Sequence, residues 1–400
     1  MRKLSLFAVS RLPLAGQVAA RLTIGLVAIL LLAPVPQRAI VRDTALSPTR
    51  APDSTPIADN RSTLRQFIAE RKWDQVAGAL QAALAAEPGD PVLHYWQGLL
   101  LGPDDPAAEG HLRRALASAD YEERAQAALD ALAGQDEARR ADRWARFGVA
   151  LVGAREWAWA ERAFDRALAD DPLLALALAY RGYAKDQQGR DGLQDIENAQ
   201  ALAPREPAGY YFAGLHWRAA GDHGASERAF LDAHWLDPWN PAFAAEVGGA
   251  LELQGAYSDA ASWYRMAVEL APDDPSWYAL LVRYYVESGY LPDAADYAFV
   301  EEAAARFPDH PDLAVSYGWA LYLQGDHAGA YDALNWAVSL APRSVRARYY
   351  FGLTLEKLGD REAAADSFWF VLDSAAPDTL YSLGAARALE RLGFQAAPSP

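Results

Sequence analysis

The chain has 400 residues, and its 52% hydrophobic and 11% aromatic content excludes wholesale disorder, because disordered segments are poor in apolar residues and cannot offset the entropy of ordering. The absence of Cys excludes disulfides, thiolate zinc sites, iron–sulfur clusters and thiol nucleophiles. The net charge is −16, and since residues 1–50 carry seven Lys or Arg against one Asp, the remaining 350 residues carry −22, a charge that repels nucleic acid and favours a basic partner.

The amino terminus has the pattern of a targeting or anchoring segment. Residues 22–33 are twelve uncharged residues, preceded by four positive charges and followed by two prolines. Twelve helical residues span about 18 Å, less than the roughly 30 Å hydrocarbon core, which favours a signal peptide. Extension back to Leu14 and the lack of a small-x-small cleavage motif slightly favour an uncleaved anchor. We therefore expect residues 1–35 to be a signal peptide or membrane anchor helix, with residues 14–35 in contact with the membrane; a buried amphipathic helix is the alternative.

The charge asymmetry around this segment predicts where the rest of the chain lies. Positive residues before the apolar run indicate an amino terminus in the cytoplasm and a body that is membrane-anchored or secreted on the extracytoplasmic, periplasmic side of a bacterial envelope. Residues 36–60 are rich in Pro, Ser, Thr and Asp and predict a disordered tether. Residues 394–400 are expected to be a tail.

Prolines and glycines recur along the remaining chain with a common period. Prolines recur at intervals of 32 to 36 residues, at Pro172, Pro204, Pro238, Pro272, Pro308, Pro342 and Pro377. Ten residues after most of them comes a glycine, at Gly182, Gly214, Gly248, Gly318 and Gly352, with Val282 as the exception. Seven residues further comes a second glycine, at Gly189, Gly221, Gly255, Gly289, Gly325 and Gly359.

Each period predicts one helical hairpin. The first stretch has apolar residues at helical spacing, as at Tyr210, Ala213 and Trp217. The second glycine can close that helix in the left-handed conformation, and a second periodic stretch then runs to the next proline. Asp90-Pro91 and similar pairs supply a cap followed by Pro at the first helical position. Because one hairpin cannot bury its own faces, neighbouring hairpins must stack.

The units follow one another from residue 61 to residue 393. Residues 62–88 form a degenerate first unit, and residues 91–120 form a second with a hairpin shortened near Gly102-Pro103. An extra helix near 121–133 interrupts the register before the regular units begin at residue 141. Residues 379–391 predict a closing helix ended by Gly393.

Fixed positions within the units carry a family pattern. Residues 241–272 show Gly248, Leu251, Ala260, Tyr264, Ala267 and Pro272, and the units at 311–342 and 345–377 repeat the same offsets. This pattern resembles the tetratricopeptide repeat (TPR) family over about 330 of the 400 residues. The resemblance implies an all-α fold, a TPR-type right-handed α-solenoid of stacked antiparallel helix pairs, in which small residues let paired helices approach closely.

The resemblance also implies a concave groove lined by the first helix of each pair. Its inward positions correspond to Tyr95, Tyr183, Tyr211, Arg218, Arg283, Trp319, Tyr322, Arg346 and Tyr349. This lining lacks the Lys and Asn pair with which chaperone-binding members hold a carboxylate tail. Rigid aromatic residues with scattered Arg suit an extended peptide or a helix, and they also suit stacking on sugars. An alternative interpretation is that some of them, above all Tyr183 and Trp319, simply pack between neighbouring helices.

No pattern in the sequence predicts catalysis. Phosphate-binding, dinucleotide-binding, zinc-protease and nucleophile-elbow motifs do not occur, and the seven His show no metal-ligand spacing. We therefore expect no enzyme activity, no cofactor, and no catalytic or metal-binding residue. The sequence predicts a noncatalytic TPR scaffold for protein–protein interaction outside the cytoplasmic membrane. The alternative is an envelope polysaccharide assembly or export factor whose groove contacts glycan.

Overall fold

The computed structural model describes residues 56–133, 138–288, 290 and 292–394. The chain divides into two compact units, unit 1 at residues 1–237 and unit 2 at residues 238–400. The predicted targeting segment 1–35, most of the predicted tether and residues 395–400 lie outside the described residues. Among the helices that are described, none is both long enough and apolar enough to cross a bilayer.

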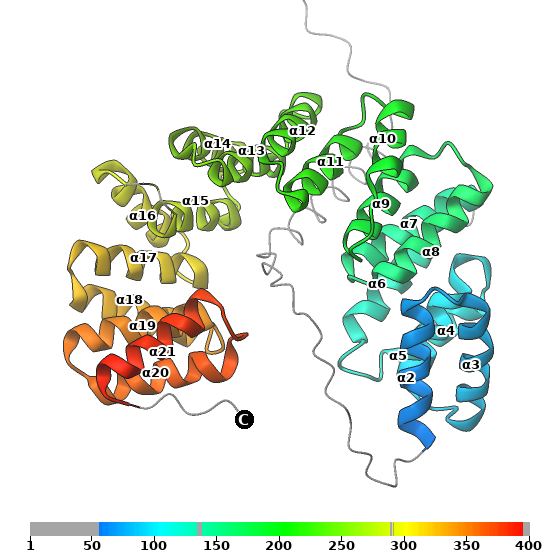
Figure 1. Ribbon diagram of the computed structural model, residues 1–400, viewed down its shortest axis with the longest axis horizontal. Coiled ribbons are helices and arrows are strands. Elements are labelled where there is room, and N and C mark those ends of the chain that lie inside the picture. The colour runs from blue at the N-terminus through cyan, green and yellow to red at the C-terminus, as the bar shows by residue number, and fades with distance from the viewer. Residues whose placement is uncertain (1–55, 134–137, 289, 291, 395–400) are drawn as a thin grey trace, which may run out of the picture. The chain divides into compact units, whose positions relative to one another are not determined.

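Unit 1 consists of α-helices joined by short turns (Figure 1). Its helices are α2 (Pro56–Ala69), α3 (Trp73–Ala86), α4 (Pro91–Leu101), the 3-10 helix η1 (Gly102–Asp104), α5 (Ala107–Ala115), α6 (Glu122–Leu132), α7 (Arg140–Gly153), α8 (Trp157–Asp170), α9 (Ala175–Asp186), α10 (Leu193–Leu202), α11 (Pro207–Ala220) and α12 (His223–Leu236). The helix α2 begins at Pro56, five residues before the predicted start of the repeats at residue 61, because Pro is compatible with the first helical position. The extra helix α6 lies where the interrupted register predicts one.

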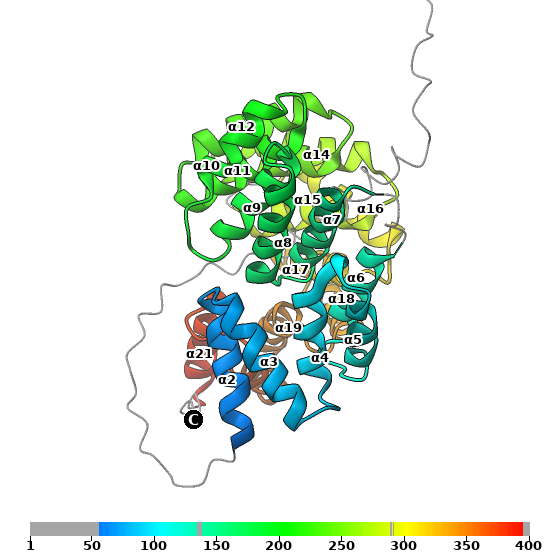
Figure 2. The same ribbon diagram turned by 90° about the vertical axis from the view of Figure 1, so that its right-hand side faces the viewer.

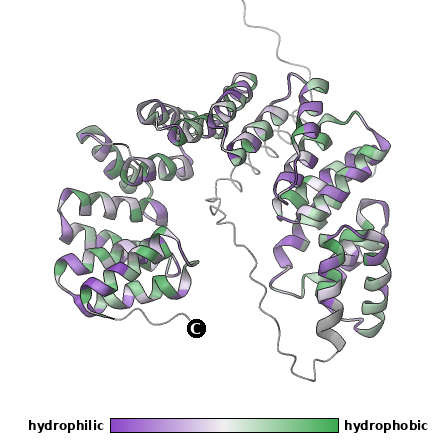
Figure 3. Ribbon diagram, viewed as in Figure 1, coloured by the Kyte–Doolittle hydropathy of each residue, from purple (hydrophilic) through white to green (hydrophobic). Residues whose placement is uncertain are grey.

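Unit 2 has the same construction. Its helices are α13 (Pro241–Leu253), α14 (Tyr257–Leu270), α15 (Pro275–Glu287), α16 (Ala294–Arg306), α17 (Pro311–Gln324), α18 (His327–Leu340), α19 (Val345–Leu358), α20 (Arg361–Ser374) and α21 (Leu380–Leu392). Hydrophobic and hydrophilic residues are interspersed along the helices of both units (Figure 3). Within the described residues of both units the regular structure is helical throughout, which confirms the all-α prediction.

Paired helices approach each other closely at the first glycine of each repeat. A Cβ atom built on Gly214 in α11 would lie 2.5 Å from the ring of Phe230 in α12, and one on Gly318 in α17 would lie 2.6 Å from Leu334 in α18. Because these glycines lack a side chain, the partner's large apolar residue can fill the position. The helix pairs are therefore TPR-like in their packing as well as in their sequence.

The ends of the helices also follow the sequence. The closing glycines have positive φ, between 71° and 88°, at Gly189, Gly221, Gly255, Gly325 and Gly359. Asp90, Asn240 and Asp274 each accept a hydrogen bond from the backbone N–H of the second residue of the helix that follows, whose first residue is Pro. Two equivalent turns instead place an arginine in the left-handed region, Arg71 at φ 58° and Arg155 at φ 59°.

The pair α15 and α16 departs from this packing, as the substitution of Val282 for glycine predicts. Val282 is fully buried, so its side chain occupies the space that the glycines leave to the partner helix. The contact between α15 and α16 is correspondingly small, and α15 packs more extensively on α17.

The first helix pair of unit 1 packs on more than its neighbour in the chain. The turn between α2 and α3 reaches α8, where Arg71 Nε donates to Glu161 Oε2 at 2.9 Å. Trp73 of α3 lies 4.9 Å, between ring centroids, from Trp159 of α8. In both views α3 lies beside α2 and α4 (Figures 1 and 2), so α3 packs between these two helices while the turn that joins α2 to α3 contacts the later helix α8.

Candidate functional site

Five of the nine predicted groove residues lie in unit 2, and the structure brings several of them together. Trp319 and Tyr322 are on α17, and Arg346 and Tyr349 are on α19. The first helices of successive pairs, α17 and α19, are in contact, and α19 also contacts the closing helix α21. We name the resulting set of side chains the aromatic face; it consists of Trp319, Tyr322, Tyr349, Tyr350 and Tyr381.

The rings of the aromatic face form one continuous cluster. Trp319 stacks on Tyr322 with centroids 4.7 Å apart, and on Tyr350 with centroids 4.3 Å apart. Tyr349 lies 5.5 Å from Tyr350 and 5.4 Å from Tyr381. Tyr350 is 6% exposed, whereas the other four rings are half-buried. These four rings are therefore held in place by their neighbours and still present part of their surface to solvent.

Backbone and small residues fix the orientation of two of the rings. The indole Nε1 of Trp319 donates to the backbone oxygen of Val286 at 3.2 Å, and since Val286 is on α15 this bond joins α15 to α17. Gly384 of α21 leaves room for Tyr349, since a Cβ there would lie 2.3 Å from the phenol oxygen. The aromatic face is thus specified by residues outside the repeat pattern as well as within it.

Arg346 lies beside the aromatic face and is engaged by acidic groups of two other helices. Its Nε donates to Glu287 Oε1 of α15 at 2.6 Å, and its Nη1 lies 3.3 Å from Asp312 of α17. Its Nη2 also donates to Ser316 Oγ. Burial alone would lower the pKa of Arg346, but the charge and hydrogen bond of Glu287 together with the charge of Asp312 outweigh it, and the pKa is raised. With its side chain 12% exposed, Arg346 joins helices and is not free to bind a partner.

The phenols of the aromatic face are neutral at physiological pH. Burial raises the pKa of Tyr322 and of Tyr349, and the charge of Glu356 raises both further. Burial and then Glu287 raise the pKa of Tyr381. Neutral phenols can both donate and accept hydrogen bonds, so the face combines apolar ring surface with polar groups at its edges.

Arg283, also predicted to line the groove, lies on α15 and is half-buried. It has no ion-pair partner within the part of the chain that the structure describes, and its charge acts on Tyr381. Arg391 of α21, in contrast, is paired with Glu356, with Nη2 2.8 Å from Oε2.

The four predicted residues in unit 1 do not form a comparable exposed surface. Tyr95, Tyr183 and Tyr211 are 0%, 3% and 4% exposed. Tyr95 packs on Tyr121 and Tyr183 on Phe212, with centroids 4.9 Å apart in each case. Their rings fill the space between successive helices and leave no free surface for a partner, which is the alternative that the sequence left open for Tyr183. Arg218 is half-buried, with its guanidinium 5.5 Å from the ring centroid of Phe230.

Two members of the aromatic face were missed by the sequence reasoning. Tyr350 is one position beyond the inward-facing Tyr349, and Tyr381 belongs to the closing helix, which has no partner to define a repeat position. The run Tyr349, Tyr350 and Phe351 is a sequence signal for a large aromatic cluster, although it does not show which rings remain exposed.

Comparisons with known proteins find likenesses among solved structures. No protein-family model matches the sequence, and no curated protein does. The chain is similar to yeast Tom70, with 18% identity, coverage of 84% of this chain and 88% of that chain, and a TM-score of 0.43. It is also similar to TTC0263, a thermophilic TPR protein of Thermus thermophilus (18% identity, 46% of this chain, 99% of that chain, TM-score 0.39), and to Pseudomonas aeruginosa pilF (16%, 53%, 96%, 0.42).

Proposed function

We propose that this protein is a noncatalytic scaffold that binds a protein or peptide segment through the aromatic face of unit 2. The supporting observation is the row of four half-buried rings, Trp319, Tyr322, Tyr349 and Tyr381, held by contacts among α15, α17, α19 and α21. Large rings that are already immobilised contribute contact area at low entropic cost, and for that reason Trp and Tyr dominate binding hot spots.

The chemistry of the aromatic face favours ligand binding over catalysis. Its polar groups are neutral phenols and an indole N–H that is already bonded to Val286. The half-buried carboxylate of Glu287, beside the face, is held by Arg346 at 2.6 Å. A carboxylate engaged in this way is a poor general base, because transfer of a proton to it would break a buried ion pair.

The proposal includes a location outside the cytoplasmic membrane, with the body attached through residues 1–35 and the tether. The positive charges before the apolar run at 22–33 support this orientation. Protease added to spheroplasts should degrade the body while a cytoplasmic marker stays intact. If the body is fully protected while an exposed periplasmic marker in the same spheroplasts is degraded, the proposed orientation is wrong.

The proposed partner is basic, because the body carries a charge of −22. Electrostatic steering then predicts an association rate that falls as salt is raised from low to physiological concentration. A rate that is unchanged over this range would show that charge does not guide the encounter.

Site-specific photo-crosslinking in the full chain tests the binding face. Tyr322 of α17 and Tyr331 of α18 are both partly exposed tyrosines of unit 2, and only Tyr322 belongs to the aromatic face. We would replace each in turn by a photoreactive phenylalanine derivative. We expect a protein adduct from position 322 and none from position 331.

Equal adducts at both positions, or an adduct only at position 331, would contradict the proposed face.

Sugar binding adds a second readout, because half-buried rings can also stack on sugars. The glycan-binding role would replace the scaffold role if the chain binds selectively to a glycan array and gives no protein adduct at position 322. That binding should be lost in Tyr322→Ala and retained in Tyr331→Ala.

A further inference from the structure

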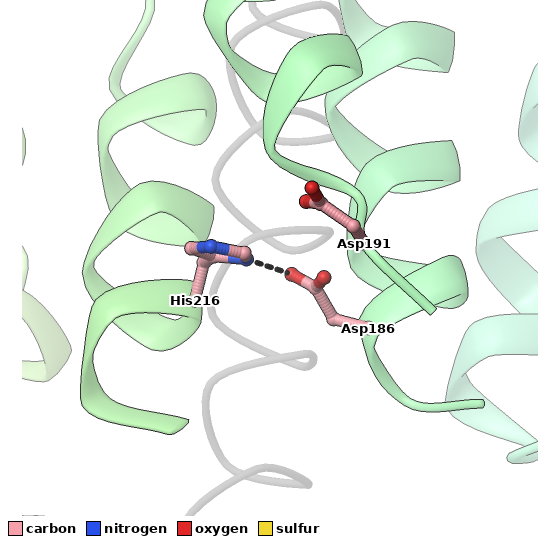
Figure 4. Close-up of side chains that lie close together, drawn as sticks. All are labelled: Asp186, Asp191 and His216. Carbon is pink, nitrogen blue, oxygen red and sulfur yellow. Dashed lines mark hydrogen bonds and ion pairs between the residues drawn. The ribbon is translucent and has the colours of Figure 1, made fainter. Parts of the chain in front are cut away.

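Three potential metal ligands of unit 1 come together between two helix pairs. Asp186 ends α9, Asp191 lies in the turn between α9 and α10, and His216 lies on α11 (Figure 4). One ligand atom from each of these residues lies within 4.8 Å of the other two. His216 Nδ1 and Asp186 Oδ2 are 3.0 Å apart. The cluster could not be predicted from the sequence, because its members lie on three separate segments.

The backbone fixes these ligands before any ion arrives. The N–H of Gly192 donates to Asp186 Oδ1 at 2.8 Å, which leaves the other carboxylate oxygen directed at His216. Gly192 itself packs on α9, since a Cβ there would lie 2.0 Å from the backbone oxygen of Gly182. The turn that carries Asp191 is therefore held against the helix that carries Asp186. A hydrogen bond to the second oxygen of a ligating carboxylate is a common means of orienting metal ligands.

The cationic side chains that adjoin these carboxylates in the sequence are paired with other acids. Lys185 pairs with Asp195 at 2.6 Å, and Arg190 pairs with Glu161. A cation bound between Asp186 and Asp191 would reduce the repulsion between their two carboxylates.

The spacing and the donor set fit a transition-metal ion. Two ligand atoms about 2.1 Å from a tetrahedral ion lie about 3.4 Å apart, so the His216 and Asp186 atoms, now 3.0 Å apart, need to separate only slightly to bind one. Asp191 is exposed, and its Oδ1 accepts from the N–H of Leu193 at 2.9 Å, which leaves its other carboxylate oxygen for the ion and lets solvent complete the coordination. An imidazole nitrogen beside two carboxylates suits Zn²⁺, whereas Ca²⁺ and Mg²⁺ prefer oxygen ligands alone.

We propose that Asp186, Asp191 and His216 form a binding site for a divalent transition-metal ion such as Zn²⁺. The ion replaces the proton between His216 and Asp186 and joins the α9–α10 pair to α11 of the next pair. Its role is structural, because binding only to the folded chain stabilises that chain by mass action. The site lies in unit 1 and does not depend on the aromatic face of unit 2.

Calorimetric titration of the untagged, chelator-treated full chain in mild detergent tests the site, with ZnCl₂ as the probe and CaCl₂ as the comparison. We expect one Zn²⁺ per chain and a rise in melting temperature with added Zn²⁺. Asp191→Asn should weaken binding at least tenfold and abolish that rise; because Asp191 is exposed, this variant should fold normally.

Matched control variants separate the site from surface binding. Glu197→Gln removes another exposed acid of unit 1, and His310→Gln removes a His of unit 2; both should bind Zn²⁺ as the parent chain does. His216→Asn should abolish the one-to-one binding, with its helix content checked by circular dichroism. Absence of saturable one-to-one binding, equal affinity in Asp191→Asn and Glu197→Gln, or Ca²⁺ binding as tight as Zn²⁺ binding would each overturn the proposal.

Discussion

Two arginines in equivalent turns should respond in opposite ways to replacement by glycine. Arg71 and Arg155 both adopt positive φ at the position where the other hairpins have a closing glycine. Left-handed backbone costs a non-glycine residue about 1–2 kcal/mol, while the extra freedom of glycine in the unfolded chain offsets about 0.5–1 kcal/mol of that. Arg155 is exposed, and its side chain makes no hydrogen bond or ion pair among the described residues. Arg155→Gly should therefore stabilise unit 1 by about 0.5–1 kcal/mol.

Arg71 gains the same backbone relief but loses its bond to Glu161. Glu161 is 5% exposed and is bonded by Arg71 at 2.9 Å and also by Arg190. A hydrogen bond to a charged group contributes about 1.5–3 kcal/mol, and we take the lower part of that range because the Arg71 side chain is 27% exposed and Arg190 remains. Arg71→Gly should thus destabilise unit 1 by about 1 kcal/mol, and the two variants should differ by about 1.5–2 kcal/mol.

Urea denaturation of the full chain, followed by far-UV circular dichroism, measures this difference, with calorimetry to resolve the transitions of the two units. A change of 1 kcal/mol corresponds to about 2–4 °C in melting temperature for a unit of this size. Arg155→Ala is the control, since alanine keeps the left-handed strain and should leave stability nearly unchanged. An Arg155→Gly variant no more stable than Arg71→Gly, or a stabilisation equally large in Arg155→Ala, would refute the reasoning.

The same pair of variants has a pH signature. Burial tends to raise the pKa of Glu161, but its hydrogen bonds to Arg71 and Arg190 outweigh burial and the pKa is lowered from 4.5. The stabilisation is therefore complete above pH 4.5 and is lost as the pH falls through the lowered value, because the unfolded chain then binds the proton more readily. The penalty of Arg71→Gly should shrink over that range.

Three further predictions concern packing, acid sensitivity and the ion pair beside the aromatic face. Gly318→Ala should destabilise unit 2 by about 1–3 kcal/mol, because its Cβ would lie 2.6 Å from Leu334. Gly249→Ala is the control: its Cβ would lie 3.5 Å from the nearest atom, so it should be neutral or stabilising in the same denaturation assay. Burial lowers the pKa of His111 from 6.5, and His94, whose Nδ1 lies 2.8 Å from that of His111, lowers it further. Because the unfolded chain then binds the proton more readily, the melting temperature should fall as the pH drops below 6.5. A fall of the same size in His111→Gln would disprove this role. Arg346→Ala should cost about 2 kcal/mol by leaving the half-buried Glu287 without its partner. A double-mutant cycle with Glu287→Ala should show a coupling above about 1 kcal/mol, and additive losses would contradict the pairing.

Helix pairing could be predicted from the sequence because its causes are local. Asp90 before Pro91 caps a helix with atoms two residues away, and Gly221 closes one through its own φ of 81°. The position of Gly214 against Phe230 follows from the same repeat, since both occupy fixed places in one hairpin. Such features depend on residues within a single period, so a recurring pattern is enough to reveal them.

The fate of individual inward-facing side chains was decided by tertiary structure. Tyr211 and Tyr349 each lie three residues before the first glycine of their repeat, yet Tyr211 is 4% exposed against Phe230, while Tyr349 is half-buried beside Tyr381. Which neighbour fills the space depends on how successive pairs stack, and the period does not encode that geometry.

The contacts between distant segments likewise exist only in the folded chain. Arg71 meets Glu161 across 90 residues, and His216 meets Asp186 across 30. Their pairing is set by the packing of α2 and α3 against α8 and of α9 against α11, and no local chemistry in either segment specifies its partner. The sequence by itself therefore determined the helices and their pairing, and the packing of one pair on another decided which charged and aromatic groups became neighbours.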